Sequence, residues 1–264
     1  MDKEPNATVL ARDDLSETVF LLRVKLDGLD ALAFEPGQFV QAGVPIDTPA
    51  KDGSGLMRLR LQKRSYSIAS APGDPQGIEL CLALVPHGRL TPALRKLDTG
   101  ARLFVDPNPL GRFTLEGIPP ERDLVLIATG TGVAPYVSMR RAYAGKGRWR
   151  RMAIVHGVRQ IVDLCYRKEL EEAAQSEMRF VYLPIVSREK DSERWSGVRG
   201  RVQQVLAKPR LQELAGIELS PKSCHVLLCG NPAMIDETRV LLEQYGFMLD
   251  TPEALGGLRF ERYW

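Results

Sequence analysis

Two different hydrophobic patterns divide the chain. In the first half, apolar residues alternate with other residues along positions 20–26 and 78–84, and this period of two is typical of strands with one buried face. Gly and Pro stand between such runs, as at Pro36-Gly37 and Pro72-Gly73, where they favour turns. Several short strands separated by turns predict an antiparallel sandwich or barrel.

Beyond Gly117 the pattern changes to continuous apolar runs, which are typical of strands buried on both faces. Segments that favour helices lie between these runs. One helix is expected within residues 163–175, which contain no Gly or Pro. A second is expected from Asn231, an N-cap residue followed by a proline suited to the first helical position. Alternation of strands and helices predicts a parallel sheet covered by helices. The apolar runs are 124–128, 153–155, 180–186 and 225–228.

We therefore expect an antiparallel β-barrel domain over residues 1–118 and an α/β domain with a parallel sheet over residues 119–264. The length of 264 residues fits two modest domains, and a single mixed domain is the alternative. The sequence has no run of about 18 apolar residues, so a membrane-spanning helix is not expected. Residues 1–5 do not resemble a secretory signal, which makes the cytoplasm the expected location.

The charge balance and the spacing of Cys and His argue against two classes of function, nucleic-acid binding and metal binding. Lys and Arg number 36 against 33 Asp and Glu, a net charge of +3, and no recognition motif accompanies it, so nucleic-acid binding is not expected. The four cysteines and three histidines are scattered without metal-ligand spacing, so no metal site is expected. Residues 124–162 contain no acidic residue, and their cations are expected either to attract an acidic protein or simply to be solvated. These cations include Arg140, Arg141, Lys146, Arg148, Arg150 and Arg151.

The segment from Gly130 to Pro135, Gly-Thr-Gly-Val-Ala-Pro, follows the first buried run of the second half. Glycines at a junction between a strand and a helix let the backbone approach a diphosphate, and the free N–H groups of the helix start attract its charge. The pattern is not a complete GxGxxG, because Pro135 stands where the third glycine would be. A plain strand-to-helix turn is the alternative.

Residues 64–70 in the barrel half read Arg-Ser-Tyr-Ser-Ile-Ala-Ser. An Arg, a Tyr and a Ser at alternating positions are expected to project to one side of a strand, where they offer a phosphate-binding fork, a flat ring and a hydroxyl. Such a set suits a dinucleotide with an aromatic head group. An ordinary strand with a polar outer face is the alternative.

These two motifs and a third, Cys229-Gly230-Asn231-Pro232, occur in the order found in the ferredoxin–NADP reductase family, and the chain resembles that family from Gly37 to its end. The terminal Tyr-Trp pair is similar to that of the bacterial ferredoxin/flavodoxin reductases. The resemblance implies an FAD-binding barrel followed by an NADP-binding domain. It further implies an oxidoreductase that transfers electrons between NADPH and ferredoxin or flavodoxin, by hydride transfer between nicotinamide C4 and flavin N5 followed by one-electron steps.

The resemblance also assigns residues to FAD. Arg64 would bind the diphosphate, Tyr66 would pack against the isoalloxazine, and Ser67 would place its hydroxyl near flavin N5. A second FAD contact would lie at residues 87–91, where Thr91 would cap a short helix. Tyr263 and Trp264 would lie against the flavin and near the adenine. The complete FAD set is Arg64, Ser65, Tyr66, Ser67, Gly88, Leu90, Thr91, Tyr263 and Trp264.

For NADP, the resemblance places the Gly130–Gly132 loop beside the cofactor and Cys229 beside nicotinamide C4. Three arginines stand where the related bacterial reductases contact the 2′-phosphate, and guanidinium forks suit a phosphate, so we expect NADP rather than NAD. The NADP set is Thr131, Gly132, Arg159, Ser187, Arg188, Arg201, Cys229, Asn231 and Pro232. The candidate catalytic residues are Ser67, Cys229 and Glu261, of which Ser67 and Glu261 are candidates for moving the proton of N5.

Two other function classes stay open. An NAD(P)H–flavin reductase, or the reductase component of an oxygenase, shares the cofactors and differs in the acceptor. A non-enzymatic flavin- or nucleotide-binding module would hold a cofactor without oxidising NADPH. The leading expectation is a monomer whose partner is an acidic electron-transfer protein, ferredoxin or flavodoxin, with no nucleic-acid or membrane partner.

Overall fold

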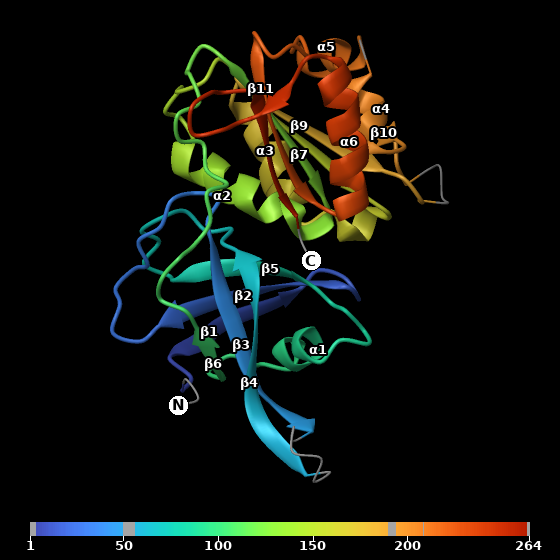
Figure 1. Ribbon diagram of the computed structural model, residues 1–264. Helices are drawn as coiled ribbons and strands as arrows, with labels where there is room; N and C mark the ends of the chain where they lie inside the picture. The colour runs from blue at the N-terminus through green and yellow to red at the C-terminus, as the bar shows by residue number, and fades with distance from the viewer. Residues whose placement is uncertain (1–3, 50–55, 190–193, 208, 263–264) are drawn as a thin grey trace. The chain divides into compact units, whose positions relative to one another are not determined.

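A computed structural model describes residues 4–49, 56–189, 194–207 and 209–262 of the chain. The chain folds as two compact units, Met1–Thr114 and Leu115–Trp264, and Figure 1 shows a strand-rich unit and a unit in which helices flank a sheet.

The first unit is a six-stranded antiparallel sheet with strand order β4-β3-β6-β1-β2-β5. An isolated bridge joins Ile68, directly after β4, to Leu80 on β5, so the two ends of the strand order meet and the sheet closes into a barrel. The expected antiparallel barrel is therefore confirmed. Its elements are β1 (Ala7–Asp14), β2 (Val19–Leu26), β3 (Phe39–Pro49), β4 (Met57–Ser67), β5 (Ile78–Ala83), α1 (Leu90–Arg95) and β6 (Arg102–Val105).

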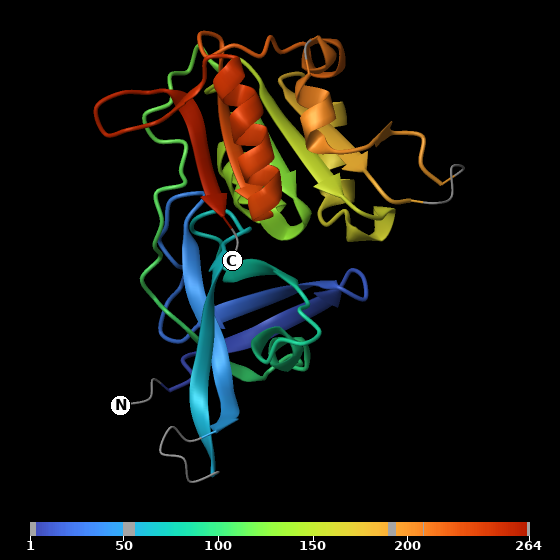
Figure 2. The ribbon, with the colours of Figure 1, turned by 45° about the vertical axis from the view of Figure 1, so that its right-hand side comes forward.

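The alternation in the sequence decides which side chains fill the barrel. Phe20, Leu22 and Val24 of β2 are fully buried, while the residues between them are partly exposed. Leu90 and Leu94 of α1 join the same core. Strands β3 and β4 pair without interruption from Phe39–Ser67 to Pro49–Met57, which forms the long hairpin seen in Figure 2.

The second unit is a parallel sheet of seven strands in the order β10-β9-β8-β7-β11-β13-β12. Helices α4, α5 and α6 pack on one face of this sheet, and α2 and α3 lie on the other (Figure 1). This arrangement confirms the predicted α/β unit. The strands are β7 (Asp123–Thr129), β8 (Met152–Val158), β9 (Phe180–Val186), β10 (Val198–Arg199), β11 (Cys224–Gly230), β12 (Met248–Leu249) and β13 (Gly257–Arg262).

An N-cap side chain and a local backbone conformation determine where the two predicted helices of this unit begin. The α-helices of this unit are α2 (Ala134–Tyr143), α3 (Arg167–Ser176), α4 (Val202–Leu206), α5 (Arg210–Ala215) and α6 (Pro232–Gln244), and η1 (Gly130–Val133) and η2 (Ile161–Asp163) are 3₁₀ turns. The Asn231 side chain accepts hydrogen bonds from the N–H groups of Ala233 and Met234, so the predicted cap of α6 is confirmed. The helix expected from residue 163 begins only at Arg167, because Tyr166 has a φ of 60° and interrupts the helical backbone.

Two further features concern the described residues alone. None of their helices has the length and apolar character needed to cross a lipid bilayer. The same residues contain no group of three His, Cys, Asp or Glu side chains placed to hold a metal ion. The four cysteines are buried and form no disulfide.

A buried ionisable cluster lies at the amino end of β11. The His225 side chain is fully buried, and its Nε2 lies 3.0 Å from Oδ2 of Asp250. Asp250 also accepts a hydrogen bond of 2.6 Å from Nε of Arg259 on β13. Burial lowers the pKa of His225 from 6.5 to about 4, so the imidazole is neutral at neutral pH.

We expect this histidine to make the protein less stable in mild acid. Between pH 6.5 and about 4 the unfolded chain binds a proton that folded His225 does not, so its contribution to stability is complete above pH 6.5 and falls with pH, by at most about 1.4 kcal/mol per pH unit. His225→Gln removes this titration. Denaturant unfolding of both proteins from pH 7 to 4.5 should show a steeper loss of unfolding free energy in the wild type, whereas parallel curves would contradict the prediction.

Candidate functional site

The carboxyl ends of the parallel strands bring most of the predicted NADP-binding residues to one edge of the sheet. Gly130–Gly132 follow β7, Arg159 follows β8, Arg188 lies two residues beyond β9, and Asn231 directly follows β11. The strands β9, β8, β7 and β11 are adjacent in the sheet, and the Arg188 N–H donates a 2.8 Å hydrogen bond to the Arg159 carbonyl. Open α/β sheets bind their ligands outside this edge, which we call the carboxyl edge.

The loops after β7 and β11 contact each other through their backbones. A Cβ atom on Gly132 would lie 2.6 Å from the carbonyl oxygen of Cys229, so only glycine fits there. The Thr129 hydroxyl accepts a 2.9 Å hydrogen bond from the Asn231 N–H, and Gly230, with a φ of 128°, packs against Thr129. The glycine loop and the Cys-Gly-Asn-Pro motif thus form one continuous backbone surface.

Two predicted phosphate-binding arginines stand at this edge without a carboxylate partner in the described part of the chain. Arg159 and Arg188 are exposed, and the Ser187 hydroxyl beside them donates to the Val158 carbonyl at 3.1 Å. Arg201, which precedes α4, differs because its Nη1 lies 3.6 Å from Oε2 of Glu237. Arg159 and Arg188 are therefore the more available cations for an anionic ligand.

Cys229 and Glu261 are neighbours across two paired strands. They are register partners of β11 and β13, with Cys229 fully buried and Glu261 partly buried. Tyr136 of α2 stabilises the adjacent pair of strands, since its buried hydroxyl lies 2.7 Å from the Leu227 carbonyl and 3.1 Å from that of Ile127. Two of the three candidate catalytic residues thus lie close together in the second unit.

The structure corrects one prediction for the barrel motif. The register of β3 and β4 is uninterrupted through Ser67, so Arg64 and Tyr66 share one face of β4 and Ser65 and Ser67 share the other. The expectation of Arg, Tyr and Ser on one side was wrong, because Tyr66 and Ser67 are sequence neighbours and strand residues alternate. Ser67 is buried, whereas Arg64 and Ser65 are exposed.

Tyr66 has a polar atom without a protein partner. Its ring packs against the barrel core, and its buried hydroxyl makes no hydrogen bond to the described residues. Burial raises the pKa of Tyr66 to about 12, so the hydroxyl stays protonated at neutral pH. An unsatisfied buried donor of this kind is costly and suits a ligand that supplies an acceptor.

The second predicted FAD segment also needs a correction. Helix α1 begins at Leu90 and its N-cap is Arg89, which makes no side-chain capping bond. Thr91 therefore lies inside the first turn, and its hydroxyl accepts a 2.9 Å hydrogen bond from the Val85 N–H. Gly88 precedes the helix and Leu90 packs into the barrel core. Tyr263 and Trp264 lie outside the described residues.

The basic segment identified in the sequence is partly neutralised. Arg140 pairs with Glu177, Arg141 with Glu169 at 2.7 Å, and Arg150 with Asp123 at 2.5 Å. These carboxylates lie outside residues 124–162, so the sequence segment alone overstated the local positive charge.

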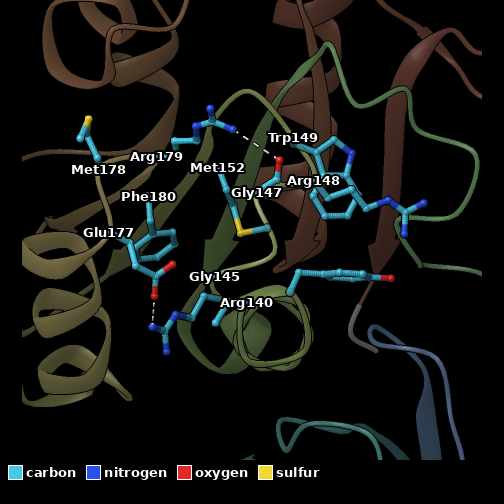
Figure 3. Close-up of a pocket in the computed structure, with 12 residues that line it drawn as sticks. Arg140, Gly145, Gly147, Arg148, Trp149, Met152, Glu177, Met178, Arg179 and Phe180 are labelled. Carbon is cyan, nitrogen blue, oxygen red and sulfur yellow. Dashed lines mark hydrogen bonds and ion pairs between the residues drawn. The ribbon is translucent and has the colours of Figure 1, made fainter.

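A groove lies beside this segment at the edge where β8 and β9 begin. Figure 3 shows Arg140, Arg148, Trp149 and Arg179 around it, and its volume is about 260 Å³. The guanidinium of Arg148 stacks 4.9 Å from the centre of the Trp149 ring. Because this groove is at the amino ends of parallel strands, it is separated from the carboxyl edge by the length of a strand, roughly 20 Å for seven residues.

Comparisons with known proteins match each of the two units to a domain family. Residues 6–115 match the oxidoreductase FAD-binding domain family, and residues 126–240 match the oxidoreductase NAD-binding domain family. The chain is 30% identical over 250 residues to a ferredoxin–NADP reductase of Azotobacter vinelandii, covering 91% of this chain and 90% of that protein. This chain belongs to the ferredoxin–NADP reductase family.

Other members of the family extend the comparison. A flavodoxin/ferredoxin–NADP reductase of Escherichia coli is 31% identical over 211 residues, which cover 79% of this chain and 78% of that protein. Among solved structures, a ferredoxin NADP⁺ reductase from Neisseria gonorrhoeae has a TM-score of 0.82 at 24% identity, with 97% of each chain covered. The family predicted from the three motifs is thus confirmed, and the last structure supports the two-domain fold.

Sequence reasoning missed two polar residues that contact the loops of the carboxyl edge. Thr129 ends β7 and bonds to Asn231, and His156 of β8 lies 2.9 Å from the carbonyl oxygen of Gly130. The available signal was their position, since each is a polar residue near the carboxyl end of an otherwise apolar strand. This signal was overlooked because the three histidines, His156 among them, were assessed only as metal ligands.

We expect the two glycines of the loop after β7 to respond differently to alanine. Gly132→Ala places a Cβ 2.6 Å from the Cys229 carbonyl and should cost roughly 2–3 kcal/mol of unfolding free energy through overpacking. Gly130→Ala meets no atom within 4 Å but has a φ of 54°, so about 1 kcal/mol is expected. Urea denaturation measures both, and an equal or smaller loss for Gly132→Ala would contradict the contact between the loops.

Proposed function

We propose that the protein is an FAD-dependent oxidoreductase that transfers electrons between NADPH and ferredoxin or flavodoxin. The observation that carries this proposal is the carboxyl edge of the second unit, where a glycine loop, Cys229 and two exposed arginines meet. The names of the relatives supply the partner class, because several are called flavodoxin/ferredoxin–NADP reductase. Residues 1–118 would hold FAD and residues 119–264 would hold NADP.

The barrel residues fit FAD in three respects. The exposed guanidinium of Arg64 can bind a diphosphate as a fork, and the unsatisfied Tyr66 hydroxyl on the same strand face can donate to an oxygen of the cofactor. Gly88 lies in the turn before α1, where the backbone can approach a ligand closely. We propose Ser65, Leu90, Thr91, Tyr263 and Trp264 as the remaining FAD contacts, following the family resemblance.

The second unit fits NADP through backbone donors and cations. The N–H group of Thr131, in the first turn of η1, has no partner within that turn and can face a diphosphate. Arg159 and Arg188 supply rigid forks for a 2′-phosphate, and we propose Arg201 as a third contact that must exchange its ion pair with Glu237. Ser187, Asn231 and Pro232 complete the proposed set.

When bound, FAD would accept a hydride at N5 from nicotinamide C4 and pass electrons on one at a time. The chain's own contribution is to hold the two rings and to exclude water. We propose that buried Cys229 forms the surface beside nicotinamide C4 and that Ser67 and Glu261 are the candidates for moving the N5 proton. The geometry places Glu261 next to Cys229 in the sheet, which favours Glu261 for proton movement on the nicotinamide side.

One structural neighbour motivates a second candidate acceptor. A cytochrome P450 reductase from Amycolatopsis has a TM-score of 0.75 at 27% identity, and the match covers 98% of this chain and 69% of that chain. A reductase that serves an oxygenase would use the same FAD and nicotinamide chemistry and differ only in what it reduces. Comparing reduction of flavodoxin, ferredoxin and free flavin at equal NADPH separates these functions.

We expect the purified protein, reconstituted with FAD if necessary, to show the absorption of oxidised flavin and to lose it on anaerobic addition of NADPH. NADH at the same concentration should bleach the flavin more slowly, because only NADPH carries the phosphate that the arginines would bind. Stopped-flow absorbance near the flavin maximum measures both rates. Absence of flavin binding would contradict the FAD assignment, and equal rates would contradict the preference for NADP.

We expect Arg188→Ala to raise the KM for NADPH roughly tenfold or more and to leave the KM for NADH nearly unchanged, because a charge-assisted phosphate contact contributes about 1.5–3 kcal/mol. Arg210→Ala is a matched control, since Arg210 is also exposed and lies on α5, where it pairs with Glu213 at 3.3 Å. Steady-state kinetics with both nucleotides measure the effect. Equal losses for NADPH and NADH would rule out a 2′-phosphate role for Arg188.

A further inference from the structure

The carbonyl oxygen of Gly130, at the start of the glycine loop, is contacted by two buried side chains. Nε2 of His156 lies 2.9 Å from this oxygen, and the Cys165 thiol donates to it over 3.9 Å. His156 and Cys165 are 0% and 1% exposed. Gly130 itself has a φ of 54°, a left-handed backbone conformation that glycine adopts readily.

The hydrogen bonds of His156 determine its tautomer. A carbonyl oxygen can only accept, so Nε2 must carry the proton. In the neutral imidazole Nδ1 is then the acceptor, and the Tyr182 hydroxyl, 3.2 Å away, is its donor. Burial raises the pKa of Tyr182 far above its ordinary value, so this hydroxyl keeps its proton. The direction of every bond from Tyr182 to the loop is therefore fixed.

The sheet register explains why these groups meet. His156 on β8 pairs with Ala128 on β7 and with Pro184 on β9, and the loop begins two residues beyond Ala128. Tyr182 precedes Pro184 by two residues, so its side chain is on the same sheet face as that of His156 and diagonal to it. The His156 imidazole is thus hydrogen-bonded on one side to Tyr182 of β9 and on the other to Gly130, the first residue after β7.

The hydrogen bond between His156 and the Gly130 carbonyl also determines the direction of the next backbone N–H group, that of Thr131. In a trans peptide the C=O of Gly130 and the N–H of Thr131 point in opposite directions within one plane. Since the Gly130 carbonyl is turned toward His156, the Thr131 N–H is turned away from it. Thr131 belongs to the first turn of η1, where an N–H has no partner within the helix. The orientation of the Thr131 N–H is therefore linked to His156.

We propose that His156 is a positioning residue for dinucleotide binding, which orients the Thr131 N–H toward the cofactor diphosphate, and that Tyr182 fixes the tautomer that makes this possible. The inference rests on the proposed NADP function of the carboxyl edge. It assigns His156 to the diphosphate, which NADPH and NADH share, and not to the 2′-phosphate that distinguishes them.

The test compares His156→Leu with His225→Leu in the full-length, FAD-loaded protein. Both histidines are fully buried in the same sheet, but His225 is at the amino end of β11, where its Nε2 lies 3.0 Å from Oδ2 of Asp250. We expect His156→Leu to raise the Kd for NADP⁺ and for NAD⁺ by the same factor, about tenfold for the loss of one positioned donor. His225→Leu should change neither Kd by more than about twofold.

A conservative pair of variants separates positioning from general loosening of the sheet. His156→Gln keeps a side-chain N–H and should restore part of the NADP⁺ affinity, and Tyr182→Phe should give a smaller loss than His156→Leu because the carbonyl bond survives. In the wild type, the ¹⁵N spectrum of the imidazole should show the tautomer protonated at Nε2. This last measurement needs no variant to fold.

The inference would be overturned by an unchanged Kd in folded His156→Leu, by an equal loss in His225→Leu, or by protonation of His156 at Nδ1. A Kd raised for NADP⁺ alone would also do so, because it would assign His156 to the 2′-phosphate. Failure of the wild type itself to bind either NADP⁺ or NAD⁺ is a different result, since it contradicts the proposed function together with the inference.

Discussion

The parallel register of β9, β8, β7 and β11 is the constraint on which the proposed chemistry depends. Because adjacent strands run in the same direction, segments separated by about a hundred residues in sequence all leave the sheet at one edge. The glycine loop, the exposed arginines Arg159 and Arg188, and Cys229 lie along one edge of the sheet for this reason. An antiparallel neighbour in place of β11 would carry Cys229 and Asn231 to the opposite edge.

Backbone contacts and side-chain hydrogen bonds then fix the arrangement of the loops at this edge. Gly132 lets the loop approach the Cys229 carbonyl, while Thr129 and His156 bond to backbone groups of the two loops. The His156 side chain is fully buried, so its hydrogen bond to the Gly130 carbonyl is costly to lose. The cations, in contrast, remain exposed, which is consistent with binding a charged ligand from solvent and releasing it again.

The sequence predicted most of this architecture because periodicity and turn residues are local signals. Phe180–Val186 was identified as a strand with its observed bounds, and the cap at Asn231 was identified from two residues. Side-chain pairing could not be predicted in the same way. The carboxylates that neutralise Arg140, Arg141 and Arg150 come from other segments. The position of Thr91 inside α1 depends on where the helix begins, and the support of Gly130 by His156 depends on sheet register.

The central claim is that the carboxyl edge binds the nicotinamide dinucleotide. Titration of ¹⁵N-labelled, FAD-loaded protein with NADP⁺, followed by backbone amide chemical shifts, tests it most directly. The account predicts the largest changes at Thr131, Gly132, Arg159, Arg188 and Asn231, with little change at the groove of Arg148 and Arg179. Changes concentrated at that groove, at the amino ends of the strands, would contradict the account.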